Sequence, residues 1–217
     1  MTKNPTRCLV CRSPEIDPFM EVEGKAYWRC ATCEATFLGM KDHPSAHEEL
    51  TQYRLHENHV DDPDYRRFLT KLAAPMLDEI LPGSKGLDYG CGPGPALAAM
   101  MREAGHTMWI YDPFFFADTA TLTQTFDFIT CSEAVEHFHH PAEEFDRLDA
   151  LLRPGGVLGV MTCFQTDDAR FANWHYRKDP THVVFYRPAT FAVLARQRGW
   201  SFSSPVKDVA LLRKPAE

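Results

Sequence analysis

The 217 residues of this chain lack several features that would assign it to a membrane, the cell exterior or a nucleic acid. No stretch approaches the roughly 18 consecutive apolar residues of a membrane-spanning helix, and residues 1–5 do not begin an apolar secretion signal. The chain has 23 Lys and Arg against 30 Asp and Glu, without the dense basic clusters that bind phosphate backbones. We therefore expect a cytoplasmic protein that has no membrane partner, and nucleic acid is disfavoured as a partner.

Seven cysteines without a secretion signal predict thiols or metal ligands instead of disulfides. Four of them form two C-x2-C pairs that are 18 residues apart, and two such pairs can face each other around a tetrahedral zinc ion. Alternation on either side of residues 23–25 predicts a hairpin between the pairs. Four unrelated buried thiols would need both spacings to arise by coincidence. We expect a zinc-ribbon module over residues 1–42, with the ligands Cys8, Cys11, Cys30 and Cys33.

Residues 86–94, Gly-Leu-Asp-Tyr-Gly-Cys-Gly-Pro-Gly, are the most informative segment. A short apolar run reaches Asp88, glycines follow at positions 90, 92 and 94, and a helix-forming stretch then runs to Gly105. A strand, a glycine loop and a helix in this order allow the backbone to approach a ligand closely, because glycine has no Cβ atom. The dinucleotide fingerprint is excluded, because its third glycine would stand where this chain has Pro95.

Three further segments follow this loop in a fixed order. Residues 108–111 form an apolar run that ends at Asp112, residues 126–130 form another, and residues 151–160 join a helix end, a Pro-Gly-Gly turn and a buried strand. An acidic residue about 20 positions beyond the glycines can accept both hydroxyl protons of a ribose. Together with Asp-x-Gly-x-Gly-x-Gly, these segments resemble class I S-adenosylmethionine-dependent methyltransferases over roughly residues 65–215.

The resemblance implies an α/β fold with a Rossmann-like sheet. Residues 188–199 are expected to form a helix before an antiparallel last strand pair at 200–203 and 206–212. Only 13 residues separate Asp112 from Phe126, so the third strand of the family is expected to be missing or short. By resemblance Asp112 holds the adenosyl ribose of S-adenosylmethionine. The residues assigned to this cofactor are Asp88, Tyr89, Gly90, Cys91, Gly92, Pro93, Gly94, Asp112, Pro113, Cys131 and Ser132.

Residues 43–64 are expected to link the ribbon to a methyltransferase domain over residues 65–217. Residues 46–55 favour a helix, and Asp62 is placed to cap the next helix, which Pro75 should kink or break. Class I enzymes often carry a lid over the cofactor at this place in the chain, although ordinary surface positions explain the same residues equally well. The lid candidates are Tyr53, His56 and Asn58.

Acidic and histidine residues follow the run at 126–130. Ser132 is expected to cap a helix that places Glu133, Glu136 and His137 on one face, because positions i, i+3 and i+4 share a helical face. Glu-x-x-Glu-His resembles the metal site of small-RNA 2′-O-methyltransferases and the same segment of ubiquinone-pathway O-methyltransferases. The former take another histidine from downstream, which His182 matches.

This resemblance implies a second, divalent metal at Glu133, Glu136, His137 and His182, which would activate and orient a hydroxyl acceptor. Without a metal, His175 or His137 could act as a general base. A third interpretation is purely structural, because acids are also favoured in the first turn of a helix. The candidate catalytic residues are Glu133, Glu136, His137, His175 and His182.

The favoured function is O-methylation of a small polar organic acceptor, to which the aromatic and ionic residues 174–179 would contribute. One alternative is an RNA methyltransferase that docks its substrate through the zinc ribbon; the acidic balance of the chain counts against it. Another is an adaptor that binds the cofactor without turnover, which the intact glycines and Asp112 disfavour. The sequence neither separates O- from C- or N-methylation nor indicates an oligomeric state.

Overall fold

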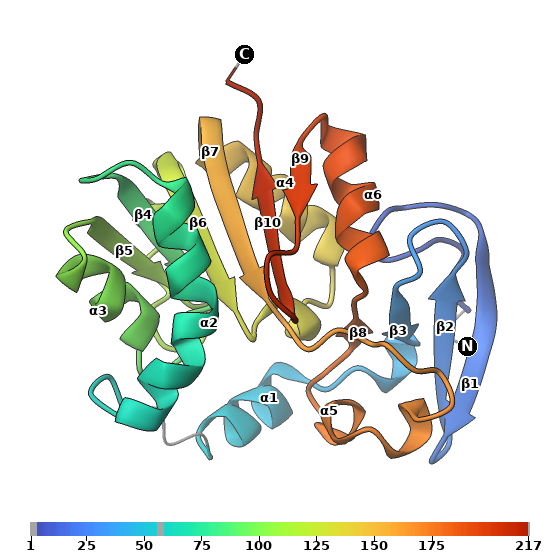
Figure 1. The fold of residues 1–217 in the computed structure, drawn as a ribbon. Coiled ribbons are helices and arrows are strands. Elements are labelled where there is room, and N and C mark those ends of the chain that lie inside the picture. Colours follow the sequence, from blue (N-terminus) through green and yellow to red (C-terminus); the bar gives the residue numbers. More distant parts are fainter. Residues whose placement is uncertain (1–3, 56–58, 217) are drawn as a thin grey trace.

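The structure, a computed structural model, describes residues 4–55 and 59–216, which form two sheets and the helices around them (Figure 1). The strands are β1 (Ile16–Val22), β2 (Lys25–Cys30), β3 (Thr36–Leu38), β4 (Lys85–Tyr89), β5 (Thr107–Tyr111), β6 (Phe126–Ser132), β7 (Leu152–Met161), β8 (Val184–Phe185), β9 (Ser201–Ser203) and β10 (Val209–Arg213). The helices are α1 (Ala46–Tyr53), α2 (Pro63–Glu79), α3 (Ala96–Glu103), α4 (Pro141–Leu151), α5 (His175–Lys178) and α6 (Pro188–Arg198).

The larger sheet has the order β5-β4-β6-β7-β10-β9. Its first four strands are parallel, whereas β10 runs antiparallel to both β7 and β9. The Rossmann-like α/β fold and the antiparallel last pair are therefore confirmed. Between β5 and β6 the described chain holds an isolated bridge and a short 3-10 turn instead of a third strand, as expected from its length. Strand β5 lies on one side of β4 and strand β6 on the other, so the strand order reverses at β4. In open parallel sheets, ligands bind at the carboxyl ends of the strands at such a switch point.

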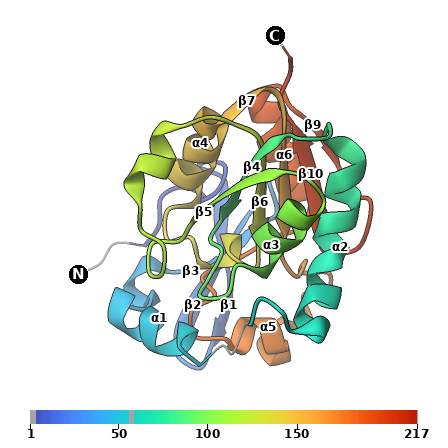
Figure 2. The same cartoon turned by 90° about the vertical axis from the view of Figure 1, so that its left-hand side faces the viewer.

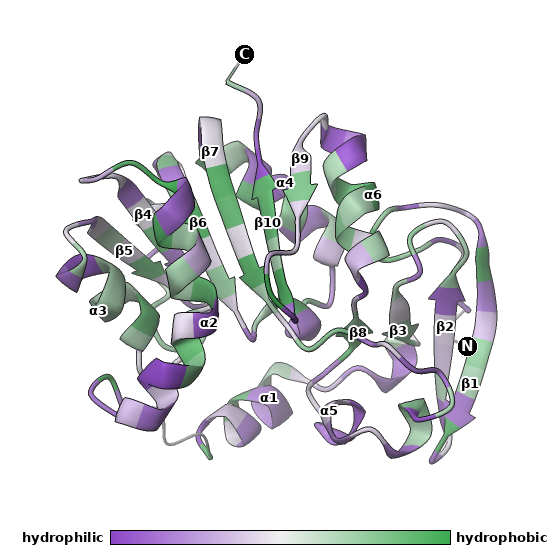
Figure 3. Ribbon diagram, viewed as in Figure 1, coloured by the Kyte–Doolittle hydropathy of each residue, from purple (hydrophilic) through white to green (hydrophobic). Residues whose placement is uncertain are grey.

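Alternating side chains of the central strands build a core on each face of this sheet. In β7, Val157 and Met161 pack under α2 and α3, whereas Leu158 and Val160 pack against α4 and α6. Figure 2 shows α4 on one side of the strands and α2 and α3 on the other. The central strands β6, β7 and β10 are mainly hydrophobic in Figure 3, as expected for strands that are covered on both faces.

The smaller sheet contains the N-terminal cysteine segment and has the order β1-β2-β3-β8. The expected hairpin is present, since β1 pairs with β2 across a turn at Glu23 and Gly24, both of which have positive φ. The fourth strand comes from residues 184–185, more than 140 residues downstream. The N-terminal module thus shares a sheet with a segment of the methyltransferase domain.

The start of α2 follows from a local signal in the sequence. Asp62 accepts hydrogen bonds from the backbone of Asp64 and Tyr65, as its predicted capping role requires. Helix α2 runs continuously past Pro75, so this proline does not break it.

The Pro-Gly-Gly turn lies inside β7 as an irregular stretch of the ladder, where Phe126 pairs with Leu152 and Phe128 with Val157. None of the described helices has the length and apolar character of a membrane span.

We expect Gly86→Ala to destabilise the fold strongly, although position 86 lies outside any site. A Cβ atom there would stand 2.2 Å from Cζ of Phe128 and 2.5 Å from Sδ of Met108. Overpacking of this kind costs about 1–3 kcal/mol, so thermal unfolding should show a melting temperature lower by roughly 3–10 °C. In a double-mutant cycle, Phe128→Leu should recover part of the loss. Strict additivity of the two changes would contradict the proposed clash.

Candidate functional site

A cavity of about 620 Å³ opens at the carboxyl ends of β4, β5 and β6. Its wall combines the glycine loop after β4, the segment after β5, the turn after β6, and side chains from α1 and α2. The loop before β8 closes the remaining side through Asp179 and His182. Residues that are distant in the sequence therefore meet at the switch point of the sheet.

The glycine loop is held close to the turn after β6. Asp88 is almost fully buried, and its Oδ1 accepts a 2.9 Å hydrogen bond from Oγ1 of Thr130. Burial raises the pKa of Asp88 to about 6. Gly90 has φ of +75°, and a Cβ atom on it would lie 2.6 Å from Cβ of Ala134. Glycine is thus required at position 90 by both conformation and space.

Asp112 connects the glycine loop to the segment after β5. Its Oδ2 accepts a hydrogen bond from the Gly92 amide at 2.9 Å, and its Oδ1 accepts from the amides of Phe114 and Phe115 at 2.9 and 3.1 Å. The carboxylate is mostly buried and lines the cavity. Its position is therefore fixed before any ligand binds.

Most of the residues assigned to the cofactor line this cavity. The exceptions are Gly94, which lies outside the lining, and Cys131, which is completely buried within β6. The lining set is Asp88, Tyr89, Gly90, Cys91, Gly92, Pro93, Asp112, Pro113 and Ser132. The lid candidate Tyr53 also lines the cavity, and its ring lies 5.2 Å from those of Phe114 and His137. His56 and Asn58 fall outside the described residues.

The helix predicted at residues 133–137 does not form, and this expectation was wrong. Strand β6 continues through Ser132, and the Glu133 amide donates to the Met161 carbonyl at 2.8 Å, so sheet pairing extends past the expected cap. The backbone then reverses at Glu133, whose φ is +48°. Only a 3-10 turn at Val135–His137 follows. The expected helical face therefore does not exist.

Tertiary packing nevertheless gathers three of the four proposed metal ligands. One ligand atom each from Glu136, His137 and His182 lies within 4.8 Å of the others. The Glu136 carboxylate is completely buried, and neither of its oxygens has a hydrogen-bond partner among the described residues. Nε2 of His137 lies 3.9 Å from Oε1 of Glu136. Burial raises the pKa of Glu136 and lowers that of His137.

Both imidazoles present the same nitrogen to this cluster. Nδ1 of His137 lies 3.1 Å from the Thr181 carbonyl, and Nδ1 of His182 lies 2.7 Å from the Tyr176 carbonyl. A carbonyl can only accept, so each Nδ1 carries the proton, and in the neutral form of each ring the lone pair is on Nε2. Nε2 of His182 also lies 4.0 Å from Oδ2 of Asp179. Backbone carbonyls fix metal-binding histidines in this way. The donor set thus fits a borderline divalent ion.

Glu133 and His175 lie apart from this group of three. Glu133 lines the cavity and accepts a hydrogen bond from the Tyr176 hydroxyl at 3.3 Å, and burial raises its pKa to about 9. The same hydroxyl lies 3.0 Å from Oγ1 of Thr162. His175 is exposed at the start of α5 and does not line the cavity.

Sequence reasoning missed several residues of the wall, among them Tyr65 and Tyr111. Asp179, the last residue of the segment 174–179 that was expected to contribute to the acceptor, does line the cavity and begins an Asp-Pro-Thr turn. Its Oδ1 accepts hydrogen bonds from the amide and hydroxyl of Thr181 at 2.8 and 2.6 Å, which shapes the loop in front of His182. The two tyrosines follow no pattern that separates a cavity wall from a core.

The four cysteines of the two C-x2-C pairs meet in one buried cluster. Sγ of Cys8 lies 3.6 Å from that of Cys33, and Sγ of Cys11 lies 3.6 Å from that of Cys30. Tetrahedral zinc with Zn–S bonds of about 2.3 Å requires separations of about 3.8 Å. The amides of Val10 and Cys11 also point at the Cys8 sulfur. The cluster therefore has the geometry of a zinc site.

A family model described as a methyltransferase domain matches residues 59–203. No curated protein matches the chain. A solved structure of 1,6-didemethyltoxoflavin-N1-methyltransferase from Burkholderia thailandensis, with bound 1,6-didemethyltoxoflavin and S-adenosylhomocysteine, aligns with 92% of this chain and 99% of its own (TM-score 0.53, 16% identity). A SAM-dependent methyltransferase from Aquifex aeolicus aligns over 76% and 96% (TM-score 0.50, 15% identity).

A further structure, an O-methyltransferase family protein from Burkholderia thailandensis, aligns with 70% of this chain at 16% identity and a TM-score of 0.46. This chain spans 59% of that protein. At such identities the structural likeness concerns the fold.

Proposed function

This chain belongs to the methyltransferase-domain family, and from that premise we propose that it transfers a methyl group from S-adenosylmethionine to a hydroxyl of a small polar organic acceptor. One observation carries the proposal. The glycine loop with Asp112 and the Glu136–His137–His182 cluster line the same cavity. A donor site and a hydroxyl-activating site must share a cavity, because transfer needs the reacting atoms about 3–3.5 Å apart.

The donor side is supported by the chemistry of S-adenosylmethionine. Asp112 would accept hydrogen bonds from the ribose hydroxyls, and the open backbone at Gly90 would let the ligand approach the loop closely. The donor carries a sulfonium and an ammonium group, both of which an acidic cavity attracts. A protein of the same fold holds S-adenosylhomocysteine, which agrees with this choice of donor.

The charge of the cavity supports a neutral or cationic acceptor over a phosphorylated one. Within the described part of the chain a single guanidinium, that of Arg147, lines it. An anionic acceptor would be repelled by those carboxylates of the wall that are ionised. This balance also disfavours RNA. The carboxylates in the wall are Glu49, Asp88, Asp112, Glu133, Glu136, Glu144 and Asp179.

On the acceptor side, Glu136, His137 and His182 would hold a divalent metal ion. When bound, such an ion lowers the pKa of a coordinated hydroxyl and turns it into a nucleophile at neutral pH. The residues themselves orient the acceptor and keep water out of the buried cluster. Glu133, whose neutral form is favoured by burial, would hydrogen-bond the acceptor from the same wall.

The cysteine cluster suits a structural zinc ion that is separate from this site. All four sulfurs are buried, so no open coordination position faces the cavity. We assign Cys8, Cys11, Cys30 and Cys33 to zinc on this geometry.

Methyl transfer from radiolabelled S-adenosylmethionine to panels of phenols, sugars, other small hydroxyl compounds and RNA tests the proposed function. We expect label in a small neutral or cationic hydroxyl compound. Donor binding without transfer to any panel member would favour the adaptor interpretation, and transfer to RNA would overturn the proposed acceptor class.

Removal of the divalent ion should stop the reaction while the fold remains intact. Brief treatment with EDTA, with zinc retention verified by elemental analysis, is expected to lower kcat by about 10²–10⁴-fold. Addition of Mn²⁺ or Mg²⁺ should restore it. Normal turnover of a protein that contains only ribbon zinc would show that the second metal is not used.

A further inference from the structure

The N-terminal module, defined as residues 4–42, is joined to the acceptor side of the cavity by its last strand. β3 begins three residues after Cys33 and pairs antiparallel with β8, with Thr36 opposite Phe185 and Phe37 opposite Val184. The Leu38 amide extends this ladder by donating to the Val183 carbonyl at 2.8 Å. β3 is the one strand that β8 pairs with in the described chain.

The segment held by β3 also holds the histidine cluster. The Val183 amide donates to the Glu136 carbonyl at 2.9 Å, and His182 precedes it in the chain. A continuous backbone path therefore runs from Leu38 through Val183 to Glu136. On its other side the Leu38 carbonyl lies 3.1 Å from Nε2 of His43. His182 thus directly precedes the residue that bonds to Leu38, and Glu136 is linked to Leu38 through that same residue, Val183.

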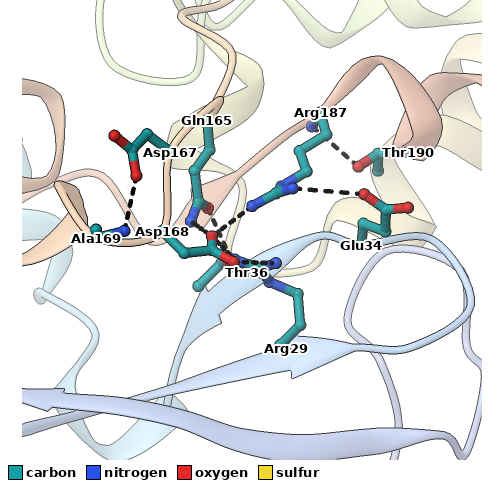
Figure 4. A network of polar contacts seen from close by, with 9 residues as sticks. All are labelled: Arg29, Glu34, Thr36, Gln165, Asp167, Asp168, Ala169, Arg187 and Thr190. Carbon is teal, nitrogen blue, oxygen red and sulfur yellow. Dashed lines mark hydrogen bonds and ion pairs between the residues drawn. The ribbon is translucent and has the colours of Figure 1, made fainter.

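Side chains reinforce this junction, as Figure 4 shows. The guanidinium of Arg187 pairs with Asp168 and lies 3.6 Å from Glu34 of the module. Arg29 of β2 reaches the same Asp168 at 2.7 Å. Beneath these ion pairs, the buried hydroxyl of Thr36 donates to Oε1 of Gln165 at 2.7 Å. The loops on both sides of β8 are therefore fastened to the module.

We infer that the N-terminal module positions Glu136 and His182, so that the cysteine cluster controls the geometry of the acceptor side. A module of about 40 residues needs a cross-link such as a structural metal ion to keep its fold. β8 has two residues and pairs with β3 alone among the described strands, so without β3 the segment would lose its ladder and keep only isolated bonds such as that from Val183 to Glu136. Loss of the cysteine cluster would thus release the segment that carries His182. The inference rests on the proposed function only in naming this segment the acceptor side.

Hydrogen exchange measured by mass spectrometry tests the inference with the full chain. In Cys11→Ser, which removes one ligand, the peptide that covers residues 181–186 should exchange at least about tenfold faster than in the wild type. Peptides from β4 and β7 should keep their rates. Cys163→Ser, a cysteine outside the cluster, is the matched control and should retain both zinc and protection.

Full protection of residues 181–186 in zinc-free Cys11→Ser would overturn the inference. If that variant is insoluble, Thr36→Val keeps all four cysteines and removes the buried bond to Gln165. It should still accelerate exchange at residues 181–186 by about threefold or more, and unchanged exchange would again count against positioning. Binding of Mn²⁺ alone, measured by electron paramagnetic resonance, is a second readout. Cys11→Ser should bind Mn²⁺ at least about tenfold more weakly than the wild type does.

The exchange rates separate this inference from the proposed function. They do not depend on a methyl acceptor or on metal at the histidine cluster. If the wild type binds no Mn²⁺ and methylates nothing, the proposed function fails, while protection at residues 181–186 still decides whether the module positions this segment.

Discussion

Glu136→Gln is expected to abolish methyl transfer and to leave the protein as stable as the wild type or more stable. The Glu136 carboxylate is fully buried, and neither oxygen finds a hydrogen-bond donor among the described residues. Nε2 of His137 lies 3.9 Å from Oε1, but a buried carboxylate without hydrogen bonds still costs free energy, so the fold alone gives little reason for a charge at position 136. Glutamine has the same shape, is neutral, and is a poor ligand for a divalent ion.

The substitution Glu136→Gln should lower the activity and raise the stability of the protein. We expect kcat to fall by about 10²–10⁴-fold, as for the loss of a general base or an activating metal. Removal of the buried charge should stabilise the metal-free fold by about 1 kcal/mol, which raises the melting temperature by about 2–4 °C for a chain of this size. Turnover with the identified acceptor and thermal unfolding after EDTA treatment measure the two effects.

Glu143→Gln provides the matched control. Glu143 is an exposed carboxylate on α4 outside the cavity lining, so both kcat and melting temperature should stay at wild-type values. A Glu136→Gln protein that is less stable yet fully active would identify Glu136 as a structural residue. The proposed metal site would then lose its most buried ligand.

The positions proposed for the donor side and those proposed for the acceptor side depend on different interactions. The loop at Asp88 and the strand end at Asp112 follow from local chemistry, namely glycine conformation and the apolar runs before each acid. Both residues line the cavity as expected. At Glu133 the local preference for a helix was overridden by pairing of β6 with β7, which takes the Glu133 amide.

The joining of the two modules could not be predicted from the sequence. Residues 184–185 form a strand of two residues, which is too short to show a period of alternation. Their pairing with Thr36 and Phe37 depends on how the cysteine module docks on the larger sheet. Likewise, the meeting of His182 with Glu136 was suggested by family resemblance alone, since 45 residues separate them and no spacing rule connects them.

Asp112→Asn is expected to weaken binding of S-adenosylhomocysteine by about 10²-fold. Asp112 would accept the ribose hydroxyl protons, and hydrogen bonds to a charged acceptor are worth about 1.5–3 kcal/mol. Asparagine keeps one oxygen for the Phe114 and Phe115 amides, but its NH₂ group would face either the Gly92 amide or the ligand. Isothermal titration calorimetry with S-adenosylhomocysteine measures the change.

Asp118→Asn is the matched control for this substitution. Asp118 caps the short 3-10 turn between β5 and β6, and its Oδ1 accepts from the Ala120 amide at 2.9 Å, outside the cavity lining. We expect no change in ligand affinity, since asparagine is as good a cap as aspartate. An Asp112→Asn protein that binds within about twofold of the wild type would exclude Asp112 from the donor site.

The two substitutions should also differ in which kinetic constant they change, and this contrast is the strongest test of a divided cavity. Loss of ground-state binding raises KM for the donor with kcat unchanged, whereas loss of acceptor activation lowers kcat. Asp112→Asn should therefore approach wild-type kcat at saturating S-adenosylmethionine, and Glu136→Gln should bind S-adenosylhomocysteine normally. If Asp112→Asn lowered kcat as strongly as Glu136→Gln, the glycine loop and the histidine cluster would act as one unit instead of separate donor and acceptor sides.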